Sequence, residues 1–379
     1  MDQHSKHELI KSYRKRYERS NKKEKSRIIN IIADSTGYCR AHIIRAFAKD
    51  IQVPKRIVRS RSSRYAHLYE TLKFIWAASN FLCGKRLAPF LPELVKSLKR
   101  HKEIRIPKED EALLLEISAA TIDRLLAPAK KEISIKGRST TKPGTLLKHQ
   151  IPIRTFADWN ENKPGFLEID LVAHCGDSTR GEYINTLDMT DVCTGWTVCA
   201  AFMGRSERFC VAAIDEIKSL FPFEILGIDS DNGSEFINAH LRRYCESNNV
   251  TFTRGRAHKK NDSCYVEQKN WDVVRKTIGY GRFDTYEQLE IIKHIHNLMV
   301  FYQNHFQPSR KLISKTRNGA KLTKKYDTAQ TPAQRLLARK DTSKDMKKLI
   351  KDNLSRLNPA AILRDINKLV SELYETLFQ

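Results

Sequence analysis

An acidic residue inside an apolar segment is the feature that most constrains how this chain can fold. The segment FLEIDLVAHCG places Asp170 in the middle of what its composition predicts to be a buried strand. A lone carboxylate is costly to bury unless it is paired or bound to a metal. Glu168 is two residues earlier and would share that face of the strand, so it is either a competing acid or a support for Asp170. The sequence therefore predicts a buried strand whose carboxylate is paired or binds a metal.

Two further carboxylates lie in the stretch from Phe223 to Trp271. Asp231 follows an expected strand in an Asp-Asn-Gly turn, and Glu267 lies in an expected helix. Each has an ordinary structural explanation, because Asp favours turns and Glu near a helix start complements the helix dipole. Carboxylates on three separate elements are nevertheless the hard oxygen ligands that Mg²⁺ prefers. Two such ions about 4 Å apart activate an attacking oxygen and stabilise a leaving one.

Together these residues resemble a known signature. Asp170, Asp231 and Glu267, with 35 residues between the last two, are similar to the Asp, Asp-35-Glu pattern of retroviral integrases and related bacterial insertion-sequence transposases. The segments SDNGSEF and KNDSCYVEQKNW resemble motifs of those transposases, and the likeness covers residues 154–307. The spacing favours Asp231 over the competing Asp229. The resemblance implies a catalytic domain with a ribonuclease H-like fold, classed as DDE.

The pattern of residues 155–307 predicts an α/β domain, a mixed sheet with helices on both faces. In the ribonuclease H-like fold that the resemblance implies, the first and fourth strands are neighbours, which would bring Asp170 and Asp231 together. A final amphipathic helix at Asp284–Gln307 should pack on this core. The other expected elements are strands at Gly165–Val172, Tyr183–Asp191, Thr194–Met203, Glu224–Ile228 and Thr251–Arg254, and helices at Glu207–Leu220 and Glu235–Asn248.

Two all-α regions, residues 1–52 and 65–130, precede this domain and are each predicted to contain a helix-turn-helix. In the first, apolar residues at helical spacing lie on both sides of Ser35-Thr36-Gly37. The second helix of that pair has polar positions suited to the major groove, although a simple helical hairpin gives the same pattern. Residues before it form either an extended arm or a first helix. The residues predicted to contact DNA there are Arg40, His42 and Arg45.

The charge of the chain favours a nucleic-acid partner. Its 68 Lys and Arg outnumber 44 Asp and Glu, giving a net charge of +24, and phosphate contacts by basic side chains release counterions. The acid-free linker VPKRIVRSRSSR and a basic loop before Glu267 are suited to phosphate, although both are also compatible with a solvated surface. The further residues predicted to contact DNA are Arg59, Arg61, Arg254, Arg256, Lys259, Lys260 and Lys269.

Residues 308–379 are expected to form a small β module and a helical tail. The segment KLISKTRNGAKLTKKYDT alternates around Asn318-Gly319, a strong hairpin signal, and its Lys and Arg predict contact with DNA. Met346–Gln379 is expected to be helical with a break at Asn358-Pro359. Its apolar positions are compatible with assembly and equally with an ordinary surface helix.

The cysteines and the hydropathy pattern restrict the compartment. None of the eight Cys forms a Cys-x₂-Cys pair, so a zinc ribbon is not expected. The sequence shows no signal peptide and no apolar run of membrane-spanning length. We therefore expect no membrane partner and an intracellular location. The resemblance to bacterial transposases implies a cytoplasmic, nucleoid-associated protein in a bacterium.

The resemblance implies a DNA transposase that binds element ends, frees a 3′-OH and transfers it onto target DNA. Asp170, Asp231 and Glu267 would hold two Mg²⁺, for which Mn²⁺ is expected to substitute. Related transposases act as multimers, so a homo-oligomer on double-stranded DNA is expected; the need for a helper ATPase stays open. Two alternatives are a catalytically inactive regulator derived from a transposase and a ribonuclease H-like nuclease without strand transfer.

Overall fold

A computed structural model describes residues 1–48, 63–132, 163–204, 206–230, 239–254, 266 and 269–378. The chain forms two compact units, Met1–Ser63 and Arg64–Gln379. Among the described residues, no helix has the length and apolar character needed to span a membrane.

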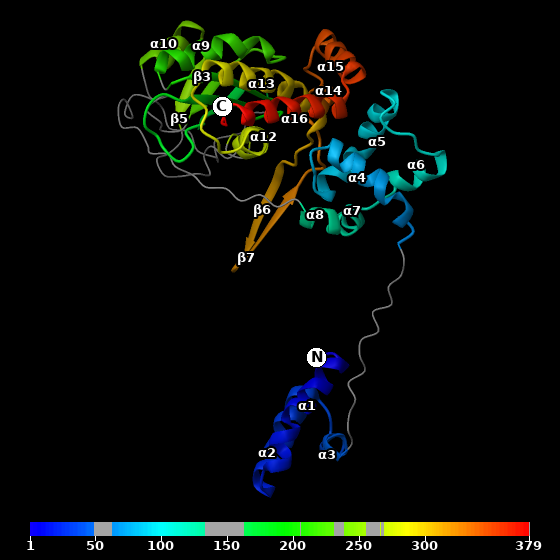
Figure 1. The fold of residues 1–379 in the computed structure, drawn as a ribbon. Helices are drawn as coiled ribbons and strands as arrows, with labels where there is room; N and C mark the ends of the chain where they lie inside the picture. The colour runs from blue at the N-terminus through cyan, green and yellow to red at the C-terminus, as the bar shows by residue number, and fades with distance from the viewer. Residues whose placement is uncertain are drawn as a thin grey trace. The chain divides into compact units, whose positions relative to one another are not determined.

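The first unit is a bundle of helices α1 (Gln3–Arg19), α2 (Lys22–Thr36) and α3 (Arg40–Ala48) (Figure 1). The residues at its start are therefore a first helix and not an extended arm. Gly37 ends α2 with a φ of +71°, a left-handed conformation that glycine adopts without strain. A helix, a short turn and a helix are thus present as expected, while their reading as a DNA-binding motif stays a prediction. The core of this unit consists of Ile10, Ile28, Ile29, Ile32, Ile43, Ala46 and Phe47.

The second unit is built on a five-stranded mixed sheet with the strand order β3-β2-β1-β4-β5. The strands β1, β2 and β3 pair antiparallel, whereas β1, β4 and β5 pair parallel, so β1 is central. The predicted mixed sheet, with its first and fourth strands as neighbours, is confirmed. The strands are β1 (Phe166–Ala173), β2 (Ile184–Asp191), β3 (Thr197–Met203), β4 (Gly227–Ser230) and β5 (Thr251–Arg254).

The fourth strand lies later in the chain than the expected Glu224–Ile228. Pairing with β1 begins only at Gly227, whose backbone is covered by the ring of Phe166. A Cβ at this glycine would lie 2.6 Å from the ring, so no other residue fits here without a shift. The later start also makes Ser230 the last residue of β4, directly before Asp231.

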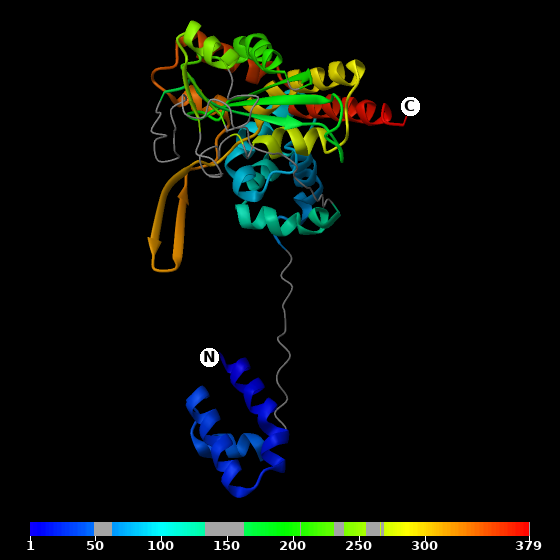
Figure 2. The ribbon, with the colours of Figure 1, turned by 90° about the vertical axis from the view of Figure 1, so that its left-hand side faces the viewer.

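Helices cover both faces of the sheet (Figures 1 and 2). On one face α9 (Glu207–Ile217) and α10 (Ala239–Ser247) contribute to a core that also includes residues of α14 (Pro332–Ala338). On the other face, α13 (Tyr286–Phe306) packs against β3 and against α16 (Pro359–Glu375). The final amphipathic helix expected at Asp284–Gln307 is thus α13, which packs on the sheet.

The helices that follow Arg64 share one hydrophobic core with α13 and α16. The Tyr302 hydroxyl donates to the Ala78 carbonyl at 2.8 Å, and the Gln307 amide donates to the Ser79 carbonyl at 2.9 Å. These contacts join the second helical region and the sheet into one compact unit. The helices are η1 (Ala66–Leu68), α4 (Tyr69–Ala78), α5 (Gly84–Arg100), α6 (Lys108–Leu115), α7 (Ala119–Leu125) and α8 (Ala127–Glu132).

The C-terminal region contains the predicted hairpin and helices. Strands β6 (Leu312–Asn318) and β7 (Lys321–Tyr326) pair around Gly319, which has a φ of +58°. Helix α15 (Lys344–Arg356) ends before Asn358, whose side chain caps α16, so the expected break is confirmed. The remaining short elements are η3 (Lys218–Leu220), η5 (Asn270–Arg275) and α12 (Lys276–Ile278).

Candidate active site

The carboxylate of Asp170 is half-buried in the central strand β1 and accepts hydrogen bonds from a backbone amide and from a side-chain amide. Its Oδ1 accepts the Leu171 amide at 2.8 Å, and its Oδ2 accepts the side-chain amide of Asn270. Asn270 begins η5, three residues after Glu267. The chain that follows Glu267 is therefore hydrogen-bonded to the carboxylate of Asp170.

Glu168 binds the chain on the other side of Glu267. Its Oε2 accepts the backbone amide of Val266 at 2.9 Å, and both residues are fully buried. Of the two readings left open, this geometry favours support for Asp170 over competition with it. Strand β1 thus contacts residue 266 through Glu168 and residue 270 through Asp170.

Asp231 and Glu267 themselves lie outside the described residues, but the strand that leads to Asp231 is described. In the parallel pairing of β1 with β4, Glu168 is opposite Asp229 and Ile169 is opposite Ser230. Ser230 and Ile169 are the residues directly before Asp231 and Asp170. Parallel strands present their carboxyl ends at one edge of the sheet, where ligands of open α/β sheets bind.

Asp229, the competing acid of β4, has a structural partner. Its carboxylate is 1% exposed and accepts the hydroxyl of Thr253, on the neighbouring strand β5, at 2.5 Å. Asp229 therefore joins two strands, which leaves Asp231 as the better candidate for the site.

A buried acid and a buried base lie on the same face of the sheet as Asp170. Asp188 is opposite Asp170 in the pairing of β1 with β2 and is fully buried, and burial raises the pKa of its carboxyl to about 7. Lys269 is 8% exposed, and burial lowers the pKa of its ammonium to about 8. Asp272 and Asp188 act in the opposite direction and raise the pKa of Lys269. Lys269 thus faces acids of its own unit.

Some of the residues predicted to contact DNA are buried, some are exposed, and the others lie outside the described residues. Lys269 and Arg254 are buried, at 8% and 7% exposure. A side chain that contacts DNA phosphate must reach solvent, and these two do not. Arg40, His42 and Arg45 are exposed in the first unit, where Arg40 donates to the Ser26 hydroxyl at 3.0 Å. The other predicted contacts lie outside the described residues: Arg59, Arg61, Arg256, Lys259 and Lys260.

The π-helix η5 connects this site to the helices after Arg64. Arg86 of α5 forms an ion pair with Asp272 of η5 at 3.3 Å and donates to the Pro308 carbonyl at 2.6 Å. Single π-helical turns are rare and often lie at functional sites. Here the π-turn begins at Asn270, the residue that binds Asp170.

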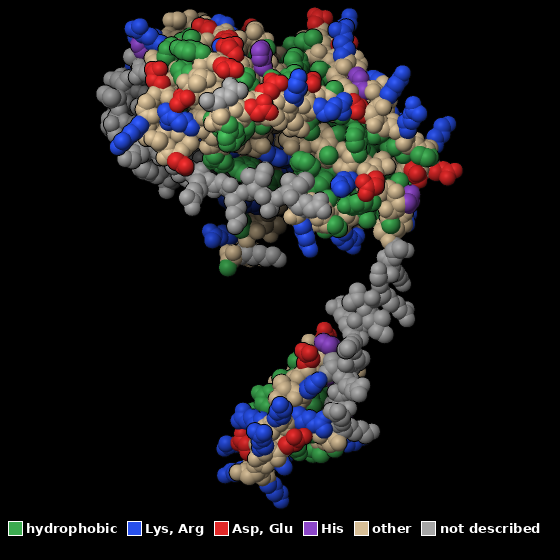
Figure 3. All heavy atoms as spheres, viewed as in Figure 1, with side chains coloured by type: hydrophobic (Ala, Val, Ile, Leu, Met, Phe, Trp, Pro, Cys, Tyr) green, Lys and Arg blue, Asp and Glu red, His purple; other side chains and the backbone are tan. Residues whose placement is uncertain are grey.

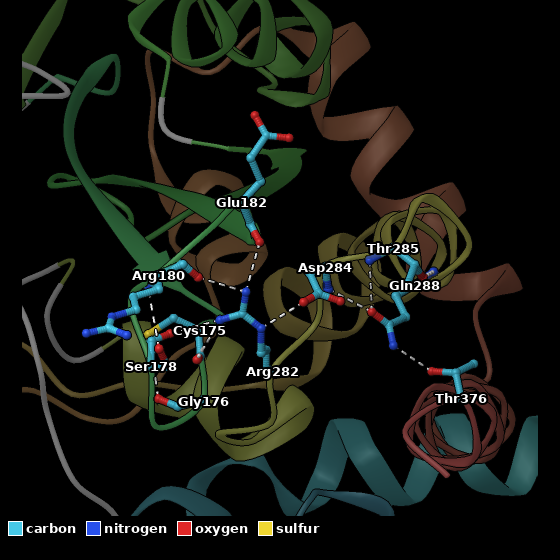
Figure 4. A network of polar contacts seen from close by, with 10 residues as sticks. All are labelled: Cys175, Gly176, Ser178, Arg180, Glu182, Arg282, Asp284, Thr285, Gln288 and Thr376. Atoms are coloured by element: carbon cyan, nitrogen blue, oxygen red, sulfur yellow. Dashed lines mark hydrogen bonds and ion pairs between the residues drawn. The ribbon is translucent and has the colours of Figure 1, made fainter. Parts of the chain in front are cut away.

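The loop between β1 and β2 is held by Arg282 (Figure 4). Its guanidinium donates to the carbonyls of Ser178 at 2.9 Å and Arg180 at 3.0 Å, and pairs with Asp284 at 2.7 Å. The nearby Gln288 side chain bonds the start of α13 and also the hydroxyl of Thr376. One arginine therefore orders the loop that follows the strand of Asp170.

The structural roles of Asn270 and Arg282 were missed in the sequence. Residues three apart on a helix share a face, which could have indicated that Asn270 lies beside Glu267. Arg282 is more than a hundred residues from the strand that it supports, and no local pattern marks it.

The chemistry of the predicted ligands fits Mg²⁺, since all three are carboxylates. Among the described residues alone, no group of three or more His, Cys, Asp or Glu could hold a metal ion. Asp170 is the described member of the predicted set, and its carboxylate is oriented by Asn270 and by the backbone.

The strand order and the acidic central strand define an integrase-type core, and comparison with known proteins agrees. The family model described as integrase core domain matches residues 160–260. The uncharacterized protein y4rM of Sinorhizobium fredii is 38% identical over 331 residues, covering 86% of this chain and 94% of that protein. The chain belongs to the same family as this protein, within the DDE superfamily of retroviral integrases and transposases.

Two of the solved structures that are similar to this chain are retroviral. The catalytic core domain of HTLV-2 integrase, in complex with magnesium, is 14% identical with a TM-score of 0.30, covering 38% of this chain and 90% of that chain. An intasome of simian T-cell lymphotropic virus, in complex with the PP2A regulatory subunit B56 gamma, is 12% identical with a TM-score of 0.32, covering 63% of this chain and 73% of that chain. These scores are too low to support an argument, so the assignment rests on the family model and the strand order.

Proposed function

We propose that this protein is a metal-dependent DNA transposase that cleaves element ends and joins the 3′-OH to target DNA. One observation carries the proposal: the chain on both sides of Glu267 is hydrogen-bonded to β1 around Asp170. The neighbouring strand β4 ends at the residue before Asp231. These contacts support the convergence of the three acids that strand transfer requires.

In the proposed mechanism Asp170, Asp231 and Glu267 hold two Mg²⁺, and Mn²⁺ substitutes. The bound metal supplies activation of the attacking oxygen and stabilisation of the leaving oxygen. Asn270 orients the Asp170 carboxylate, and Glu168 fixes the backbone before Glu267. The chain contributes positioning and charge, so no protein nucleophile is needed.

The first unit is the proposed reader of element ends. Its α3 helix has exposed Arg40, His42 and Arg45, and Lys and Arg side chains are spread over the surface of this unit (Figure 3). The linker and loop residues Arg59, Arg61, Arg256, Lys259 and Lys260 are proposed phosphate contacts. Two ends must be held together, so we propose a homo-oligomer on DNA in the bacterial cytoplasm and nucleoid.

The test is incubation of the full chain with element-end duplexes, Mg²⁺ and a target plasmid, followed by sequencing of joined products. Joined ends are expected for the wild type and absent for Asp231→Asn, which still binds DNA. Nicks without joined products would favour a ribonuclease H-like nuclease. Specific binding without any cleavage would favour an inactive regulator.

A further inference from the structure

The hairpin of β6 and β7 is a two-stranded ribbon that projects from the rest of the second unit (Figure 2). Residues 313–320 and 322–326 are exposed on both faces. An isolated two-stranded hairpin is marginally stable in water. A partner bound along the exposed strands would therefore stabilise the ribbon.

The charge of the ribbon identifies the chemistry of that partner. From Ser309 to Tyr326 the chain has seven Lys or Arg and no Asp or Glu. Lys315 and Lys324 lie directly opposite each other in the strand pairing, and like charges in that position are destabilising. A polyanion would offset this repulsion, whereas an apolar or basic partner would not.

The base of the ribbon is fixed to the body of the unit. The Lys311 amide donates to the Asp327 carboxylate at 2.6 Å, and Arg335 pairs with the same carboxylate at 2.7 Å. The Lys311 ammonium donates to the carbonyls of Val192 and Cys193 in the turn after β2. The exposed strands therefore extend from an anchored root, which reduces the entropy lost on binding.

The strand register gives the ribbon two different faces. Directly opposite residues share a face, so Lys315, Lys324, Arg317 and Leu322 lie on one side. Ser314, Thr316, Thr323 and Lys325 lie on the other side, which has one cation among these four residues. The first face combines three cations with one apolar side chain, as expected of a surface that meets bases as well as phosphates.

We propose that the β6–β7 ribbon inserts into the major groove of duplex DNA with the Lys315, Arg317 and Lys324 face toward the bases. The major groove, about 12 Å wide, admits a two-stranded ribbon. The proposal rests on the proposed function in that duplex DNA is the substrate. A second copy of the chain is disfavoured as the occupant, because lysines along an exposed strand oppose pairing with another strand.

The test compares two triple variants of the full chain with equal loss of charge. One is Lys315→Gln/Arg317→Gln/Lys324→Gln on the ribbon, and the matched control is Lys344→Gln/Lys348→Gln/Lys351→Gln on exposed positions of α15. Affinity for an element-end duplex is measured without divalent metal over a range of salt concentrations. Loss of these three groove-facing cations should weaken binding to the duplex, and each of them that also neutralises a phosphate should lower the salt slope by about 0.9. The control should keep both the affinity and the slope of the wild type.

Dimethyl sulfate footprinting of guanine N7 then reports the major groove. Guanines protected by the wild type should lose protection in the ribbon variant and keep it in the control. Unchanged protection, or equal loss of slope in both variants, overturns the proposal. If the ribbon variant no longer self-associates without DNA but keeps the wild-type salt slope, the partner of the ribbon is a second copy of the chain. That result also overturns the proposal. If the wild type binds no DNA the proposed function fails as well, whereas wild-type binding with an unaffected ribbon variant removes the ribbon's role alone.

Discussion

The two faces of the central sheet differ sharply although the same strands form both. In β1, Leu167 and Ile169 are fully buried in the apolar core that includes residues of α9 and α10. The alternate residues Glu168 and Asp170 hydrogen-bond the segment around Glu267. One side of β1 carries apolar residues that stabilise the fold. The other side carries acidic residues that position the candidate site, and burying these carboxylates costs free energy.

Strand β2 repeats this division. Leu187 and Met189 lie in the apolar core, whereas Asp188 and Thr190 lie on the polar face and bond each other at 3.2 Å. Helix α13 covers part of that face with polar groups, among them Asn304, which bonds the backbone of β3. Substitutions on the two faces should therefore change different properties.

The largest effect is expected from Asp170→Asn on the polar face. An amide is uncharged and a poorer ligand for a hard cation, so DNA cleavage should fall at least about a hundredfold, since metal catalysis contributes several kcal/mol. DNA binding and folding should be kept. The neighbouring Ile169→Val is the control, with full activity and about 0.5–1.5 kcal/mol lower free energy of unfolding. Cleavage by Asp170→Asn at near the wild-type rate would refute the site.

On the apolar face, Leu187→Ala should lower the free energy of unfolding by about 2–5 kcal/mol, because the side chain is fully buried and leaves a cavity. Urea unfolding measures this change. Cleavage per folded molecule, measured well below the melting temperature, should stay unchanged. A specific loss of cleavage in the folded variant would show that the two faces are not separable.

A smaller effect is expected from Glu168. Glu168→Ala removes the acceptor of the buried Val266 amide, and an unsatisfied buried donor costs about 1–3 kcal/mol. Glu168→Gln keeps an acceptor oxygen and is the matched control. Hydrogen exchange should show faster opening at Val266 in the alanine variant, with reduced cleavage, and near wild-type behaviour in the glutamine variant. Equal rates of hydrogen exchange at the Val266 amide in both variants would contradict the proposed role of Glu168 in fixing the backbone before Glu267.

The adjacency of the first and fourth strands was predicted from the fold that the resemblance implies. The strands themselves and Asp170 were predicted because they depend on local patterns. Alternation and an acid in an apolar run can be recognised within about ten residues. The partnership of Asp170 with Asn270 and the burial of Lys269 depend instead on how distant segments pack. The late start of β4 was missed because the segment FEIL is apolar enough for a strand, while the pairing itself depends on Gly227 lying under Phe166.

The last expected effect is absent at neutral pH, and it sharpens the contrast as the pH falls. On the polar face the Thr186 hydroxyl lies 2.9 Å from Nε2 of both His174 and His296, which are buried. Burial lowers the pKa of His296 to about 3 and that of His174 well below its usual value. The folded protein keeps them neutral while the unfolded chain binds protons below about pH 6.5, so stability should fall as pH decreases from 6.5 toward 3.

Each such histidine contributes about 1.4 kcal/mol per pH unit within that range. His296→Gln should remove one of these contributions from the dependence of the free energy of unfolding on pH. His294→Gln, at an exposed position of the same helix α13, should leave that dependence unchanged. Urea unfolding at several pH values between 7 and 4.5 measures the slopes. The same slope in the wild type and both variants would mean that the buried histidines of the polar face do not titrate on unfolding.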